Sequence, residues 1–138
     1  MNLDNLEREG YIKRLPASKR KVEDALNLAK RDIKTARSIL EQDRDWSFSI
    51  AYNAMLQTIR ALMFSKGYRP SGSNQHISVV RFAEVLLDEE TVIMFDRMRR
   101  KRHSTIYDTA GTISKTEAES AVDTAERLIQ KIERIIRG

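Results

Sequence analysis

The sequence contains no cysteine, which excludes disulfide bonds, thiolate metal sites and thiol nucleophiles. Carboxylates and two histidines, His76 and His103, are the remaining metal ligands. His76 has no second ligand nearby at a metal-binding spacing. The sequence therefore predicts neither a metal site nor a cofactor.

Long apolar runs are also missing. No stretch approaches the roughly 18 apolar residues that a membrane span requires, and the acidic start Met1–Asp4 lacks the apolar core of a signal peptide. We therefore expect a cytoplasmic protein with no membrane partner. The sequence also has no glycine-rich phosphate loop, no H-E-x-x-H or G-x-S-x-G motif and no series of aromatic residues for stacking on single strands. Most familiar enzyme classes are thus unsupported.

Proline and glycine are scarce, at two and five residues, and most of them fall between stretches with helical apolar spacing. Alternation of β-branched residues is absent, so the sequence predicts an all-α fold. We expect one domain, residues 1–138, forming an up-and-down bundle of four to five helices. The expected helices are a short one over Leu3–Tyr11, a long one from Pro16-Ala17-Ser18 to Leu40, a central one over Trp46–Lys66 after a break at residues 43–45, one over Asn74–Leu87, one capped by Asp88, and a last one opened by a Thr116–Glu119 capping box.

The charges favour an anionic partner, with 25 Lys and Arg against 20 Asp and Glu, a net charge of +5 and a pI near 9.6. Five basic residues crowd less than two helical turns: Arg97, Arg99, Arg100, Lys101 and Arg102. Like charges three or four residues apart weaken a helix by about 0.2–0.5 kcal/mol per pair, so such crowding favours a phosphate-binding patch. A solvated helix end, whose cations favour the helix dipole, is the alternative.

Arg102 lies four residues after Met98 and seven after Phe95, on the inward face if the helix continues that far. A guanidinium there needs a partner, which a ligand or a second subunit can supply. His103 and Tyr107 are one turn apart and can share a face with Arg99. A lone histidine, however, is more often a structural residue than a catalytic one.

Two polar residues interrupt the apolar central helix. Asn53 and Arg60 are seven residues apart and lie on one side of it. Buried polar groups need hydrogen-bond partners. The two residues are therefore either tertiary anchors, which we favour slightly, or the opposite wall of the arginine site.

Three stretches and the final helix together resemble the HEPN superfamily, and in particular its small single-domain prokaryotic members. The ordered set covers nearly all of the chain. The stretches are Leu28–Ile33, then Ala51–Met55 with Arg60–Met63 and Gly67-Tyr68, and then Arg99–His103 with Tyr107-Asp108, followed by Glu117-Ala118-Glu119 in the last helix.

The resemblance implies a helical bundle that dimerises, with the late arginine motif of each subunit meeting at a cleft where nucleotide or RNA binds. Some members of the superfamily are metal-independent ribonucleases, and many are the toxin half of a toxin–antitoxin pair with a minimal nucleotidyltransferase. Arg102 matches the arginine of the ribonuclease motif, His103 matches the polar residue after it, and Tyr107 stands where catalytic members have histidine. An unperturbed phenol with a pKa of about 10 is a poor general base near pH 7.

The leading hypothesis is a nucleotide- or RNA-binding HEPN protein, the toxin-like partner of a nucleotidyltransferase, that forms a homodimer and cleaves RNA weakly or not at all. In this hypothesis Arg102, His103 and Tyr107 form the centre of the site. One alternative is a metal-independent ribonuclease in which His103 replaces the missing histidine. The other is a dimerisation module without catalysis.

Overall fold

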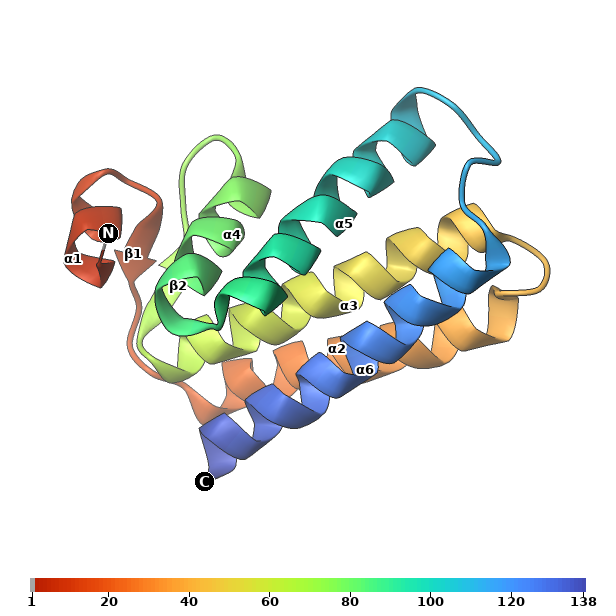
Figure 1. The fold of residues 1–138 in the computed structure, drawn as a ribbon. Helices are drawn as coiled ribbons and strands as arrows, with labels where there is room; N and C mark the ends of the chain where they lie inside the picture. The colour runs from red at the N-terminus through yellow and green to blue at the C-terminus, as the bar shows by residue number, and fades with distance from the viewer. Residues whose placement is uncertain (1) are drawn as a thin grey trace.

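The computed structural model describes residues 2–138, which form six helices and two short strands (Figure 1). The all-α helical bundle predicted from the sequence is confirmed. The elements are α1 (Leu3–Arg8), β1 (Ile12–Arg14), α2 (Lys19–Ile39), α3 (Arg44–Ser65), β2 (Tyr68–Pro70), α4 (Gln75–Leu86), α5 (Glu89–Tyr107) and α6 (Lys115–Arg137).

The central helix is α3, which packs against α2, α4, α5 and α6. Its apolar side chains point in nearly all directions, so neighbours must cover it on several sides. Tyr52, Met55 and Ile59 are fully buried along its length. The amphipathic helices α2 and α6 lie alongside it and form the long part of the bundle (Figure 1).

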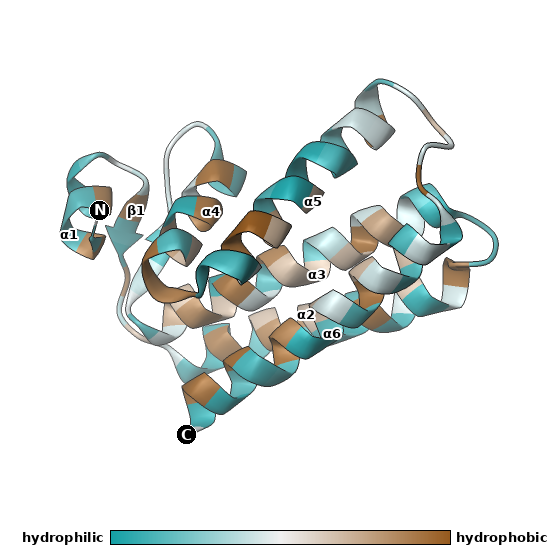
Figure 2. Ribbon diagram, in the orientation of Figure 1, coloured by the Kyte–Doolittle hydropathy of each residue, from teal (hydrophilic) through white to brown (hydrophobic). Residues whose placement is uncertain are grey.

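Helices α4 and α5 lie over the other side of α3. Figure 1 shows α5 starting close to α3 and diverging from it along its length, after which residues 108–114 lead back to α6. The first half of α5 is partly apolar, whereas the second half is strongly hydrophilic (Figure 2). Phe95, Met98 and Thr105 are its only buried residues. The basic half of α5 is therefore attached to the bundle along a narrow stripe.

Two short strands, which the sequence did not predict, accompany the helices. Ile12 pairs with Pro70 and Arg14 with Tyr68 in an antiparallel ladder. The predicted helix over Leu3–Tyr11 accordingly ends at Arg8, and β2 ends at Pro70. A strand of three residues is too short to show an alternating pattern.

Two helix starts also differ from the prediction. α3 begins at Arg44, because the Asp43 carboxylate accepts a hydrogen bond from the Trp46 backbone N–H and caps the helix there. The capping box of α6 is formed by Ser114 and Glu117, two residues before the predicted pair. Ile113, which precedes this cap, is buried in the core, and its burial favours the earlier start.

Among residues 2–138, no helix is both long and apolar enough to cross a membrane.

Candidate functional site

The basic run lies on α5, which stays helical as far as Tyr107. This confirms the helical geometry on which the inward placement of Arg102 depended. Because successive residues of a helix are rotated by about 100°, the run divides among three directions. The five basic residues therefore do not form one patch.

Arg97 and Lys101 face α6. They line a groove of about 400 Å³ between α5 and α6, together with Phe48, Met98 and Ala121. Lys101 Nζ lies 3.6 Å from a carboxylate oxygen of Glu117. This groove therefore has an apolar floor and a rim of mixed charge.

Arg100, His103 and Tyr107 point away from the bundle. Arg100 pairs with Asp96 at 2.9 Å, and its side chain is largely exposed. The rings of His103 and Tyr107 are in contact, with centroids 4.8 Å apart, and Tyr107 is 65% exposed. The predicted pairing of these two side chains on one face is thus present, on the outer side of the protein.

Arg102 points inward, as predicted, and its contacts are not ionic. Its Nε donates a hydrogen bond of 3.0 Å to the buried hydroxyl of Ser49, and its guanidinium lies 5.7 Å from the centroid of the Tyr52 ring. Within residues 2–138 no carboxylate pairs with Arg102. The guanidinium is held in place while its charge stays uncompensated.

Tyr52 links Arg102 to His76. The Tyr52 ring stacks between Phe95 and His76, at centroid distances of 5.3 and 5.8 Å. Its hydroxyl lies 3.0 Å from His76 Nδ1. His76 is in the first turn of α4, just after the cap Asn74, so α3, α4 and α5 all meet at this point.

The surroundings favour the uncharged forms of both rings. Burial raises the pKa of the Tyr52 phenol well above its ordinary value of 10.0, and the positive charges of Arg102 and Arg99 only partly oppose this effect. Burial also lowers the pKa of His76 below 6.5, and the charges of Arg102, Arg99 and Arg60 lower it further. At pH 7 the phenol therefore keeps its proton and the imidazole is neutral.

The residues of the central helix, Asn53 and Arg60, have different partners. Asn53 Nδ2 donates a hydrogen bond of 2.7 Å to the buried carboxylate of Asp32 on α2, which corresponds to the anchoring alternative. Arg60 lies against the ring of Phe64, and its buried Nε has no hydrogen-bond partner in residues 2–138. Its positive charge contributes to the lowered pKa of His76.

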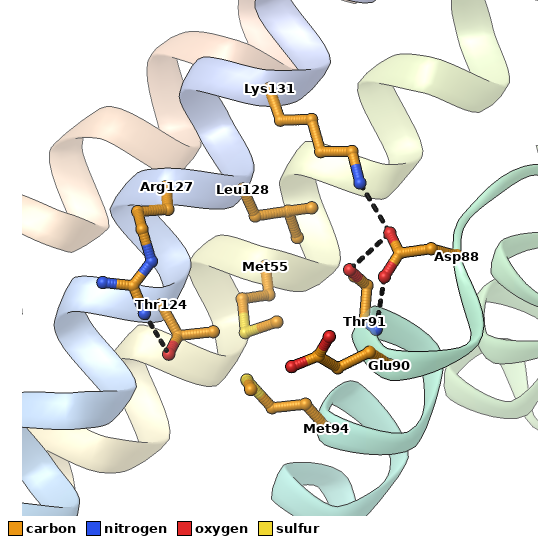
Figure 3. A pocket seen from close by; sticks show the side chains of 9 residues that line it. All are labelled: Met55, Asp88, Glu90, Thr91, Met94, Thr124, Arg127, Leu128 and Lys131. Atoms are coloured by element: carbon orange, nitrogen blue, oxygen red, sulfur yellow. Dashed lines mark hydrogen bonds and ion pairs between the residues drawn. The ribbon is translucent and has the colours of Figure 1, made fainter.

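A cavity of about 210 Å³ lies at the other end of α5 (Figure 3). Met55, Met94 and Leu128 form its apolar part, and Lys131 pairs with Asp88 at its edge. Asp88 also caps α5 through the Thr91 backbone N–H, so this ion pair stabilises the fold. The cavity is smaller than the roughly 300–1,000 Å³ of most ligand sites.

Metal ligands do not gather anywhere in the described part of the chain: residues 2–138 contain no group of three or more His, Asp or Glu side chains able to hold a metal ion.

Sequence reasoning missed Tyr52 and His76. They are 24 residues apart on different helices, and no local spacing links them. The available signal was the hydroxyl of Tyr52 on the apolar central helix, because a buried tyrosine hydroxyl usually has a hydrogen-bond partner.

Comparison with known proteins supports this architecture. The crystal structure of TT1696 from Thermus thermophilus superimposes with a TM-score of 0.64 and 19% sequence identity, over 83% of this chain and 97% of that chain. An identity this low shows similarity of fold alone. No curated protein sequence matches the chain. The family model of the HEPN domain matches residues 22–135, which include α3, α4, α5 and nearly all of α2 and α6. The chain therefore belongs to the HEPN domain family.

Proposed function

We propose that this HEPN protein binds RNA or nucleotide with the face of α5 that carries Arg102 and Arg99, which contact phosphate. The Arg99 side chain is 25% exposed, and its charge acts on Tyr52 and His76. Membership of the HEPN family supports a function related to nucleotides or RNA. The observation that carries the proposal is the environment of Arg102. A guanidinium held by a hydroxyl and a tyrosine ring, with no carboxylate, keeps its charge for an anion.

The proposed partner protein is a second copy of the chain. HEPN proteins commonly form dimers, and two observations support dimerisation through α5. Ile93 and Tyr107 are 49% and 65% exposed on this helix. The first turn of α5 carries Glu89 and Glu90, and its second half is basic, so antiparallel pairing of two α5 helices brings opposite charges together.

We further propose that the protein is the toxin-like half of a toxin–antitoxin pair with a minimal nucleotidyltransferase. The resemblance of the arginine motif to such proteins supports this role. In this protein Tyr107 replaces the histidine, so we expect binding with slow cleavage or none.

A metal-independent ribonuclease is the second candidate. Its supporting observation is the contact between the exposed rings of His103 and Tyr107, which brings a titratable imidazole to the end of α5.

The test is the affinity for a short single-stranded RNA, measured by fluorescence anisotropy. We expect Arg102→Ala to weaken binding about 10-fold or more, since a charge-assisted hydrogen bond contributes about 1.5–3 kcal/mol. Arg20→Ala is the matched control, because it removes the same charge from a fully solvated side chain on α2. The proposal fails if the two variants bind equally well, or if Arg102→Ala lowers only the melting temperature.

A further inference from the structure

The contacts of His76 fix the direction in which its ring can donate a hydrogen bond. The ring is stacked on Tyr52 at an interplanar angle of 17°, and Nδ1 faces the phenol oxygen. Tyr52 is fully buried, and its hydroxyl has no other hydrogen-bond partner in the described residues. The phenol proton therefore goes to Nδ1, and the neutral imidazole carries its own proton on Nε2.

His76 is half-buried, and Nε2 makes no hydrogen bond within residues 2–138. The pair thus presents one oriented N–H donor, on a ring near enough to Arg102 and Arg99 for their charges to act on it.

The charges around this donor are unbalanced. Arg102, Arg99 and Arg60 all act on His76. Asp96 is the one carboxylate among the groups that act on the pair, and it already lies 3.0 Å from Arg99 and 2.9 Å from Arg100. The guanidiniums of Arg102 and Arg60 have no carboxylate partner in the described residues. Because Arg99 and Arg100 share Asp96, these three groups keep one net positive charge, and Arg102 beside them adds a second.

Two positive charges match the charge of a phosphate monoester. A phosphate monoester carries about −1.5 to −2 charges at pH 7 and has three acceptor oxygens, whereas a phosphodiester within an RNA strand carries a single charge. A monoester can accept hydrogen bonds from several converging donors at once.

We propose that Arg99, Arg102 and His76 Nε2 form a pocket for a phosphate monoester, the terminal phosphate of a nucleotide or of an RNA strand, with Tyr52 as the positioning residue for His76. This inference rests on the proposed function and specifies which part of the ligand is recognised. No covalent step is involved.

Binding in this pocket has a consequence for protons. The dianion offsets the charges of Arg102, Arg99 and Arg60 that lower the pKa of His76. The pKa of His76 therefore rises on binding. Tyr52 on α3 and Asp96 on α5 are the other titratable groups around the pair.

The experiment compares ligands that differ only in the terminal phosphate: a 5′-phosphorylated and a 5′-hydroxyl RNA tetranucleotide, and AMP and adenosine. We expect each phosphorylated ligand to bind at least 10-fold more tightly than its partner. His76→Gln should reduce this preference below about 3-fold. Arg20→Ala, the charge control on α2, should behave as the wild type. A preference with the RNA pair alone identifies an RNA end as the ligand, and a preference with the AMP pair alone identifies a free nucleotide.

A second measurement needs no folded variant at position 76. The protein has two histidines, so proton NMR of the wild type shows two imidazole signals, which His103→Gln assigns. Saturating AMP or phosphorylated RNA should raise the pKa of His76 by at least half a unit. Equal binding of phosphorylated and hydroxyl ligands, or no change in the His76 titration, overturns the inference. If Arg102→Ala still weakens RNA binding in that case, the proposed function stands without it.

Discussion

The hydrogen bond between Asn53 and Asp32 joins α3 to α2. Its removal tests whether Asn53 holds the two helices together or lines the RNA-binding site. Asn53→Ala leaves one oxygen of a carboxylate that is only 6% exposed without its donor at 2.7 Å, although Arg31 still binds the other oxygen. A hydrogen bond to a charged group contributes about 1.5–3 kcal/mol, so we expect a loss of about 2 kcal/mol. With an entropy of unfolding of roughly 2.1 cal/mol/K per residue over 138 residues, the melting temperature should fall by about 7 °C.

Urea denaturation and thermal unfolding monitored by circular dichroism give these two quantities. Asn27→Ala, at an exposed position of α2, is the matched control and should change stability little. The double variant with Asp32→Ala should show a coupling of about 1–2 kcal/mol between the two sites. RNA affinity should stay unchanged. Weaker RNA binding by Asn53→Ala, at unchanged stability, would show that Asn53 lines the site and that the anchoring argument is wrong.

Three further predictions concern chemistry, pH and assembly. Tyr107→His should raise metal-independent RNA cleavage, measured in the presence of a chelator, because a histidine with a pKa near 7 supplies general acid–base assistance of about 10²- to 10⁴-fold. Strong cleavage by the wild type that disappears in His103→Ala would instead favour the ribonuclease alternative. His76 binds its proton less readily in the folded than in the unfolded state. As the pH falls below 6.5, the wild type should therefore lose stability relative to His76→Gln, by at most about 1.36 kcal/mol per pH unit. Urea titrations at several pH values measure this difference. A difference that does not vary with pH would refute the burial of a neutral His76. Light scattering at micromolar concentration should give a mass twice the 16.0 kDa of one chain. Glu89→Lys should shift the protein toward the monomer. A wild type that is monomeric at all salt concentrations excludes the dimer.

The sequence was informative where helical spacing is long and regular. Val22, Leu26, Ala29 and Ile33 repeat over enough turns to define one buried face of α2, and the same holds for α6. The helix ends were less certain, because Ser114–Glu117 and Thr116–Glu119 are equally good capping boxes by sequence. The burial of Ile113, a tertiary effect, selects the first.

The site was predictable only in part, for a geometric reason. Helical phase placed Arg102 on the inner face, and the structure agrees. Its neighbours come from other helices. Ser49 and Tyr52 meet Arg102 across 53 and 50 positions of sequence, and the packing of α5 against α3 decides that contact. No periodicity within one helix contains that information.

The short pairing of β1 with β2 gives the first part of the chain a role beyond covering the core. Residues before 22 lie outside the HEPN match. They nevertheless support the loop that leads to His76, because the Ser71 backbone N–H donates to Tyr11 and the backbone of Gly72 passes close to that of Gly10. The segment before residue 22 thus supports one side of the candidate site. A change in this segment can therefore alter the site while the helical bundle stays the same.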